Sequence, residues 1–362
     1  MKRKFWPLFA LLIAGALLLS GCAGAPSRGW SGPVVVEDTL YAGTMEGKLV
    51  SYTLVTEPRR AAVEWWRFPP RGEPGLFAIY GTPFVEEGVV YIGAYNGKVY
   101  ALDAEHGHRI WAYPEEGYIG SIVGSPLVDG GTLYIGSSDG KLYALDAETG
   151  YKQWEFQTGD DIWASPAVYD GVVYIGSFDH NLYALDAESG EEIWQFTTQG
   201  AIASTPLIHN ETLYIGSFDS KFYALNLDGT EKWRFEEAGN WFWTKAVVYD
   251  DIIIAGCLDH KIYALDAESG EQVWNYETGG PIRGDPALVG ELVIFGSDDG
   301  KVYALAAATG GERWSRTLEP PTQVRAPLFP GEGVVYVHAF NQTIYALEME
   351  YGNTIWSVTT SE

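Results

Sequence analysis

The stretch Tyr183-Ala184-Leu185-Asp186, followed by Trp194, is one copy of a phrase that recurs along the chain. Two other close copies are Tyr143-Ala144-Leu145-Asp146 with Trp154 and Tyr263-Ala264-Leu265-Asp266 with Trp274. Counting weaker copies, the phrase starts at 100, 143, 183, 223, 263, 303 and 345, so the intervals are 43, 40, 40, 40, 40 and 42 residues. A period near 40 residues is typical of stacked structural units.

Residues 161–200 illustrate what one unit contains. The runs 162–168, 172–177, 181–186 and 191–197 are rich in strand-forming residues, and turn signals such as Asp170-Gly171 and Asp179-His180 separate them. This pattern predicts four antiparallel strands joined by hairpins. Radial packing of such sheets buries both faces of each, which favours a β-propeller over a linear β-solenoid.

Two markers give the number of units. A tryptophan ends each unit: Trp65 or Trp66 in the first, then Trp111, Trp154, Trp194, Trp233, Trp274, Trp314 and Trp356. A small residue with proline, or an equivalent pair, opens each unit: Gly32-Pro33, Thr82-Pro83, Ser125-Pro126, Ser165-Pro166, Thr205-Pro206, Lys245-Ala246, Asp285-Pro286 and Ala326-Pro327. Both counts predict an all-β, eight-bladed propeller of four-stranded antiparallel blades. We expect it to form a single domain over residues 30–360 that begins and ends on whole units.

The N-terminal residues follow a different pattern. Lys2-Arg3-Lys4 precedes an apolar run, 5–19, that is short for a spanning helix, and Leu19-Ser20-Gly21-Cys22 matches a bacterial lipobox. We therefore predict a lipoprotein signal peptide over residues 1–21, lipidation of Cys22, and a flexible tether that ends at residue 29. Such a chain is exported and lipid-anchored. It faces the periplasm from the outer membrane of a two-membrane host, or lies on the outer face of a single plasma membrane.

The charge of the chain restricts its partners. There are 48 acidic and 23 basic residues among 362, a formal net charge of −25, and no basic stripe. This field repels nucleic acid and favours neutral or cationic partners. We expect a monomer. Apart from Cys22 the only cysteine is Cys257, which we expect to be a buried, inert thiol.

The repeat resembles a known family. Ala144-Leu145-Asp146-Ala147-Glu148-Thr149-Gly150, with Trp154, is similar to the tryptophan-docking motif of pyrroloquinoline-quinone (PQQ)-type repeats. The resemblance covers residues 30–360 and implies a quinoprotein-like propeller in which each tryptophan stacks over the turn glycine of an adjoining blade. The docking residues that it implies are Trp111, Trp154, Trp194, Trp233, Trp274, Trp314 and Trp356, with Gly150, Gly190, Gly270 and Gly310. The first unit lacks a glycine turn between Thr53 and Ala62, so the motif does not predict docking at the ring closure.

Two branches of this family differ in function. Many PQQ-dependent alcohol dehydrogenases carry adjacent cysteines, and this chain has no such pair. The lipobox and the chain length favour the other branch, the non-catalytic lipoproteins similar to BamB. The resemblance therefore implies a non-enzymatic scaffold of the cell envelope, without a resident cofactor or metal, that binds the outer-membrane assembly machinery. Two alternatives stay open: an oxidoreductase using PQQ and Ca²⁺, and a carbohydrate- or ligand-binding surface lipoprotein.

The repeated aspartates and the candidate binding residues lie at different places in the unit. Asp146 and its equivalents begin turns, where aspartate caps its own backbone, so we interpret them as structural. The connector before the first strand and the hairpin between strands two and three should lie at one end of the blade. The binding rim predicted there is Trp30, Tyr80, Tyr95, Trp163, Phe178, Phe218, Trp243, Arg283, Arg325 and Phe340. We also place Val324 at the rim, because it stands three residues before Pro327. Trp241 and Phe242 lie nearby in the sequence.

Aromatic and arginine side chains are enriched at binding hot spots, so these residues are candidates for a contact surface. The alternative interpretation is that the rings plug the channel and pack on one another.

Overall fold

The described residues, 29–55 and 60–361 of this computed structural model, form thirty-two β-strands in a pattern of four that repeats eight times. The first strands have three residues each: β1 Val34–Val36, β5 Phe84–Glu86, β9 Leu127–Asp129, β13 Ala167–Tyr169, β17 Leu207–His209, β21 Val247–Tyr249, β25 Ala287–Val289 and β29 Phe329–Gly331. The second strands are β2 Thr39–Gly43, β6 Val89–Ala94, β10 Thr132–Gly136, β14 Val172–Gly176, β18 Thr212–Gly216, β22 Ile252–Gly256, β26 Leu292–Gly296 and β30 Val334–Ala339. The third strands are β3 Leu49–Val55, β7 Lys98–Asp103, β11 Lys141–Asp146, β15 Asn181–Asp186, β19 Phe222–Asn226, β23 Lys261–Asp266, β27 Lys301–Ala306 and β31 Thr343–Glu348. The fourth strands are β4 Ala61–Phe68, β8 Arg109–Tyr113, β12 Lys152–Gln157, β16 Glu192–Thr197, β20 Glu231–Phe235, β24 Gln272–Glu277, β28 Glu312–Thr317 and β32 Thr354–Thr359.

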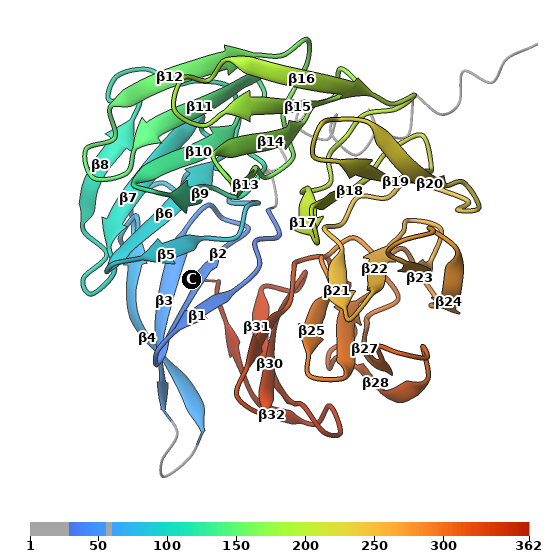
Figure 1. Ribbon diagram of the computed structural model, residues 1–362. Coiled ribbons are helices and arrows are strands. Elements are labelled where there is room, and N and C mark those ends of the chain that lie inside the picture. The colour runs from blue at the N-terminus through green and yellow to red at the C-terminus, as the bar shows by residue number, and fades with distance from the viewer. Residues whose placement is uncertain (1–28, 56–59, 362) are drawn as a thin grey trace, which may run out of the picture.

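Each set of four consecutive strands pairs in chain order as one antiparallel sheet, and the eight sheets stand around a central axis (Figure 1). We number these sheets as blades 1 to 8 along the chain. The predicted eight-bladed propeller is confirmed. The described residues contain no helix long and apolar enough to cross a membrane.

The first strand that we predicted within residues 161–200 is too long. In blade 4 we expected a strand over 162–168, but β13 begins only at Ala167. The residues before it hydrogen-bond to the preceding blade instead of to β14: Ile162 N donates to Ser137 O at 3.1 Å, and Ser165 Oγ accepts from Ser125 N at 2.8 Å. The segment is therefore a connector that joins one blade to the next near the axis.

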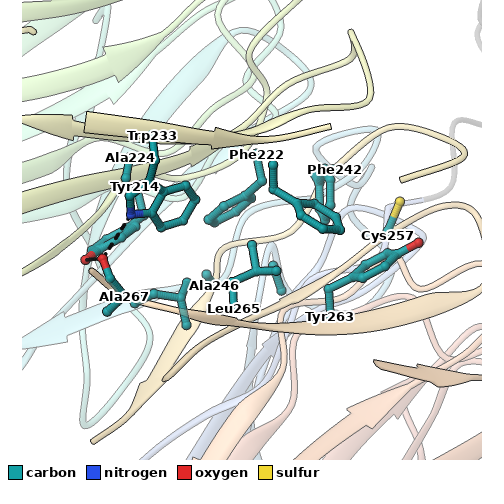
Figure 2. Close-up of a cluster of buried hydrophobic side chains, with 13 residues drawn as sticks. Tyr214, Phe222, Ala224, Trp233, Phe242, Ala246, Cys257, Tyr263, Leu265 and Ala267 are labelled. Atoms are coloured by element: carbon teal, nitrogen blue, oxygen red, sulfur yellow. Dashed lines mark hydrogen bonds between the residues drawn. The ribbon is translucent and has the colours of Figure 1, made fainter. Parts of the chain in front are cut away.

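Tryptophan docking joins most neighbouring blades. Trp233 of blade 5 lies over Gly270 of blade 6, where an added Cβ would come within 2.6 Å of the indole Cδ2 atom. Its Nε1 donates to Ala267 O at 3.0 Å (Figure 2). The same contact recurs in the pairs Trp66–Gly107, Trp111–Gly150, Trp154–Gly190, Trp194–Gly229, Trp274–Gly310 and Trp314–Gly352. Trp66, rather than Trp65, is thus the docking residue of the first unit.

The ring closes differently between blades 8 and 1. Strand β1 lies beside β29 and β4 beside β32, and neither blade takes a strand from the other end of the chain. Trp356 packs here against a buried cluster that includes Tyr52 of blade 1 and Tyr336 of blade 8, and none of the described glycines lies beneath its indole.

A second contact is also altered at this closure. In seven blades the second strand carries a glycine against which an apolar residue of the next connector packs: Gly43–Ile79, Gly93–Ile122, Gly136–Ile162, Gly176–Ile202, Gly216–Phe242, Gly256–Ile282 and Gly296–Val324. In blade 8 the corresponding residue is His338, which pairs with Ile344 as Gly176 pairs with Leu182. In the connector of blade 1 the corresponding residue is Gly29. An added Cβ at Gly29 would meet Ile79 O of the next connector at 2.2 Å, so Gly29 faces that connector rather than His338.

Cys257 is fully buried, at the position where other blades carry serine (Figure 2). Its Sγ donates to Asn240 O at 3.2 Å and to Trp241 O at 3.4 Å, much as Ser177 Oγ donates to two connector carbonyls. Burial raises the pKa of the thiol, so the reactive thiolate is disfavoured.

We predict that Cys257→Ser changes the free energy of unfolding by less than about 1 kcal/mol, because serine makes the same contacts elsewhere in the ring. Cys257→Ala should cost about 1–3 kcal/mol, since both carbonyls lose their donor. Denaturant titration of the two variants measures the difference. Equal stability of the serine and alanine variants would contradict this role of the thiol.

Candidate functional site

A cavity of about 80 Å³ lies on the propeller axis, lined by the connectors that lead into the first strands. One residue of each connector contributes a side chain: Trp30, Tyr80, Val123, Trp163, Ala203, Trp243, Arg283 and Arg325. Each follows the residue that packs on the glycine of the preceding blade, as Trp163 follows Ile162, except in blade 1, where Gly29 precedes Trp30. Extended backbone points successive side chains in opposite directions, so one is buried between blades and the next lines the cavity.

Two residues that we placed at the rim are buried instead. Val324 is fully buried against Gly296, and Arg325 takes the rim position. The prediction was one residue off because Pro327 aligns with Ser165, not with Pro166. Phe242 is fully buried in the contact between blades 5 and 6 (Figure 2).

Polar side chains two residues further along three of the connectors, Ser125, Ser165 and Asp285, accept hydrogen bonds from the preceding connector. Ser125 Oγ accepts from Thr82 N at 2.9 Å, and Asp285 Oδ1 accepts from Lys245 N at 2.7 Å. Asp285 lines the cavity, and burial raises the pKa of its carboxyl group. We used these residues only to count units, and their bonds between blades were not expected.

Five aromatic side chains of blades 4 to 6 form a continuous cluster on one side of the cavity mouth, which we call the aromatic arc. Phe218 is its centre: it stacks on Trp241 with centroids 4.4 Å apart and planes within 6°, and lies 5.3 Å from Trp243. Trp163 extends the arc, 4.4 Å from Phe178 and 6.1 Å from Trp243. All five rings are half-buried. The rings of the aromatic arc therefore pack on one another and are also partly exposed.

The opposite side of the mouth is also aromatic. Tyr80 lies 5.0 Å from Trp30 and 5.4 Å from Tyr95, again measured between ring centroids. Burial raises the pKa of Tyr80 to about 12. The Tyr80 hydroxyl group is thus neutral at physiological pH.

Charged groups complete the rim between these two aromatic sides. Asp298 accepts from Arg283 Nε at 3.0 Å and from Arg325 Nε at 2.8 Å. The Arg325 guanidinium also lies 4.8 Å from the centroid of Phe340. Both arginines were predicted at the rim, but the hydrogen bonds that join them to one carboxylate were not. The sequence signal for Asp298 was its position just before the hairpin turn, which is equivalent to the position of Phe178.

Aromatic and arginine side chains are prominent in the lining of the site. It offers aromatic faces and guanidinium groups that are already held in place by neighbours. Among residues 29–55 and 60–361, no three His, Cys, Asp or Glu side chains are arranged to hold a metal ion. The turn aspartates act on their own backbone: Asp146 Oδ1 accepts from Thr149 N at 2.8 Å, and hydrogen bonds from Thr149 lower the pKa of its carboxyl group. The predicted signal peptide and Cys22 lie outside the described residues.

Comparisons with known proteins agree with this fold. A family model described as outer membrane protein assembly factor BamB matches residues 20–156, 151–281 and 258–362. The crystal structure of BamB from Moraxella catarrhalis matches with a TM-score of 0.71 and 21% sequence identity, covering 85% of this chain and 93% of that one. The computationally designed Ika8 protein matches with a TM-score of 0.76 and 15% identity, covering 90% and 98%. These two likenesses show the fold alone. No curated protein sequence is significantly similar to the chain.

Proposed function

The chain belongs to the family of the outer membrane protein assembly factor BamB, and from this premise we propose that it is a non-enzymatic scaffold that binds a protein partner during outer-membrane protein assembly. The observation that carries the proposal is the aromatic arc at the mouth of the axial cavity. Fold alone does not fix function, so the argument rests on this surface.

The arc is suited to protein binding because its rings are already ordered. Trp241 and Trp243 both stack on Phe218, which removes side-chain freedom before a partner arrives. Binding then costs less conformational entropy than it would on flexible side chains. Large aromatic residues with partly exposed faces are also the residue types that dominate interface energies.

We also propose that the scaffold is anchored through Cys22 after removal of residues 1–21. The lipobox supports this step, and the net charge of −25 disfavours adsorption to an anionic membrane surface through the propeller itself. The acyl chains would hold the propeller at the membrane.

We predict that Trp243→Ala, in the full-length protein, weakens binding to its assembly partner at least about tenfold, because truncating a hot-spot tryptophan costs about 2 kcal/mol or more. The partner is recovered from envelope extracts and then titrated in purified form. Tyr151→Ala is the control: Tyr151 is an exposed aromatic residue in the turn between strands three and four, at the other end of blade 3. This variant should bind normally.

Two results would contradict the proposal. One is an envelope extract from which the wild-type protein recovers no assembly component. The other is reduction of a dye, with alcohols or sugars as substrates, after reconstitution with PQQ and Ca²⁺. Binding of glycans in place of protein would favour a carbohydrate-binding lipoprotein.

A further inference from the structure

Phe77 stands at the apex of an unfavourable turn between blades 1 and 2. Its side chain is 63% exposed, and its φ is +69°, a region that bulky residues rarely adopt. Ala78 N donates to Leu76 O at 3.1 Å around it, which makes the turn a γ-turn of the strained kind. The backbone would be relaxed by glycine at this position, yet the chain has an exposed phenylalanine there.

The turn lies between two hydrogen bonds that hold the connector in place. In blade 1 and its connector, Leu76 N donates to Gly47 O at 2.8 Å, and Tyr95 N donates to Ala78 O at 2.9 Å. One residue, Phe77, separates these two anchors. Because Leu76 and Ala78 are both buried, the turn is held firmly and Phe77 is directed outward.

The corresponding connector of blade 4 has more room. There Thr158 N donates to Gly140 O at 2.8 Å, and Phe178 N donates to Asp161 O at 2.9 Å. Two residues separate the equivalent anchors, Thr158 and Asp161. The blade 2–3 connector also has one residue, Gly120, between its equivalent anchors Ile119 and Ser121, yet Gly120 has no positive φ. The positive φ is therefore particular to Phe77, and a backbone outlier of this kind is often associated with function.

The next connector carries a second exposed aromatic side chain. It precedes its anchor residue, whereas Phe77 follows the equivalent anchor. Tyr118 is 81% exposed, and the following residue, Ile119, donates its N–H to Gly97 O at 2.9 Å. This is the same anchor as that between Leu76 and Gly47, one blade further along. Both connectors lead into first strands, so Phe77 and Tyr118 project from neighbouring blades at the end of the ring that carries the rim.

Acidic residues predominate around these two rings, and the exposed Arg71 of the same connector is paired with Glu64 at 3.0 Å. Exposed carboxylates lie on the same connectors and on the adjoining hairpin: Glu46, Glu73, Glu115 and Glu116. An apolar surface with acidic borders is complementary to an apolar cleft bordered by lysine and arginine. A second copy of this chain, or an anionic lipid surface, would bring like charges together.

We propose that Phe77 and Tyr118 are a second docking surface, which inserts into an apolar cleft with basic borders on a protein partner. This inference rests on the proposed function and adds where, and with what chemistry, a partner is held. The surface is separate from the aromatic arc, which belongs to blades 4 to 6.

The experiment is site-specific photo-crosslinking in the full-length protein, with p-benzoylphenylalanine at position 77, 118, 243 or 151 and envelope extract as the probe. We expect positions 77 and 118 to crosslink to one protein, at peptides that line an apolar cleft containing Lys or Arg, and position 151 to give no product. Crosslinks at 243 alone would overturn the second surface and leave the proposed function intact. Crosslinks at 77 and 118 to lipid or to a second copy would also overturn it, and no crosslink at any position would overturn both proposals.

Variants test the same surface by affinity. Phe77→Gly should reduce the affinity for the purified crosslinked partner at least tenfold, while the melting temperature stays unchanged or rises because the strain is relieved. Tyr118→Ser, on a backbone without positive φ, should reduce affinity in the same direction, and added salt should weaken the wild-type complex. Unchanged affinity in both variants would refute the proposal, and a lowered melting temperature for Phe77→Gly would assign that side chain a structural role.

Discussion

Trp154→Ala is expected to lower the free energy of unfolding by about 4 kcal/mol, as for other buried aromatic residues that are truncated to alanine. The indole is 9% exposed and lies over Gly190 of the next blade, and its Nε1 donates to Ala187 O at 3.1 Å. The Ala187 carbonyl keeps a second donor, the Tyr134 hydroxyl group at 3.1 Å. The loss therefore comes mainly from the cavity opened between blades 3 and 4. The shift of the denaturation midpoint measures it.

Trp356→Ala is the matched control for this prediction. Trp356 occupies the same position in blade 8 but is half-buried, without a described glycine beneath it, so we expect a smaller loss. Gly190→Ala tests the same contact by changing the glycine instead of the tryptophan. An added Cβ would lie 2.6 Å from Trp154 Cδ2, on a backbone with φ of +72°, so this variant should also be strongly destabilised. Equal losses for Trp154→Ala and Trp356→Ala would show that the glycine contact is not the source of the stability.

The blades were predictable because local signals repeat in register with them. The third strand, expected over 181–186, is observed as β15 with the same bounds, since turn residues flank it on both sides. The first strand was not predictable in the same way. The run 162–168 is apolar throughout, but its first half bonds to the preceding blade, and hydrophobic pattern does not distinguish partners within a sheet from partners between sheets.

The rim was predicted from topology and not from any motif. A four-stranded meander places the connector and the second hairpin at one end, and the connectors do bring Trp163, Trp243 and Arg283 to one axial cavity. The errors at Val324 and Phe242 arise from the alternation of extended backbone, where a shift of one residue exchanges the cavity for the core.

The features that the sequence did not indicate lie where the repeat is interrupted. Phe77 and Tyr118 occupy connectors whose lengths differ from those of other blades, so the period assigns them no equivalent position. The positive φ of Phe77 occurs between two hydrogen bonds that exist only in the folded ring. The unusual position of His338 is likewise recognised only by comparison with the glycines that occupy the equivalent position in seven other blades.

His338 should make the stability of the ring depend on pH. Its imidazole is 4% exposed, Nδ1 donates to Ser31 O at 3.0 Å, and Nε2 has no hydrogen-bond partner among the described residues. Burial lowers the pKa of this histidine from its ordinary value of 6.5 to about 4. A proton on Nε2 would lack an acceptor between blades 8 and 1, so the folded protein excludes a proton that the unfolded chain binds.

The sign of the effect follows from this difference. The unfolded chain takes up the proton near pH 6.5, so stability is greatest above that pH, falls as pH decreases towards 4, and then levels off. The difference between a pKa of 6.5 in the unfolded chain and about 4 in the folded protein corresponds to about 3 kcal/mol in the free energy of unfolding. His338→Asn retains a donor for Ser31 O but does not titrate, so the stability of wild type relative to this variant should fall by about that amount between pH 7.5 and 4. Carboxylates such as Asp146 contribute equally to both proteins and cancel in the comparison. Parallel pH profiles for the two proteins would mean that His338 is protonated as readily in the closed ring as in the unfolded chain.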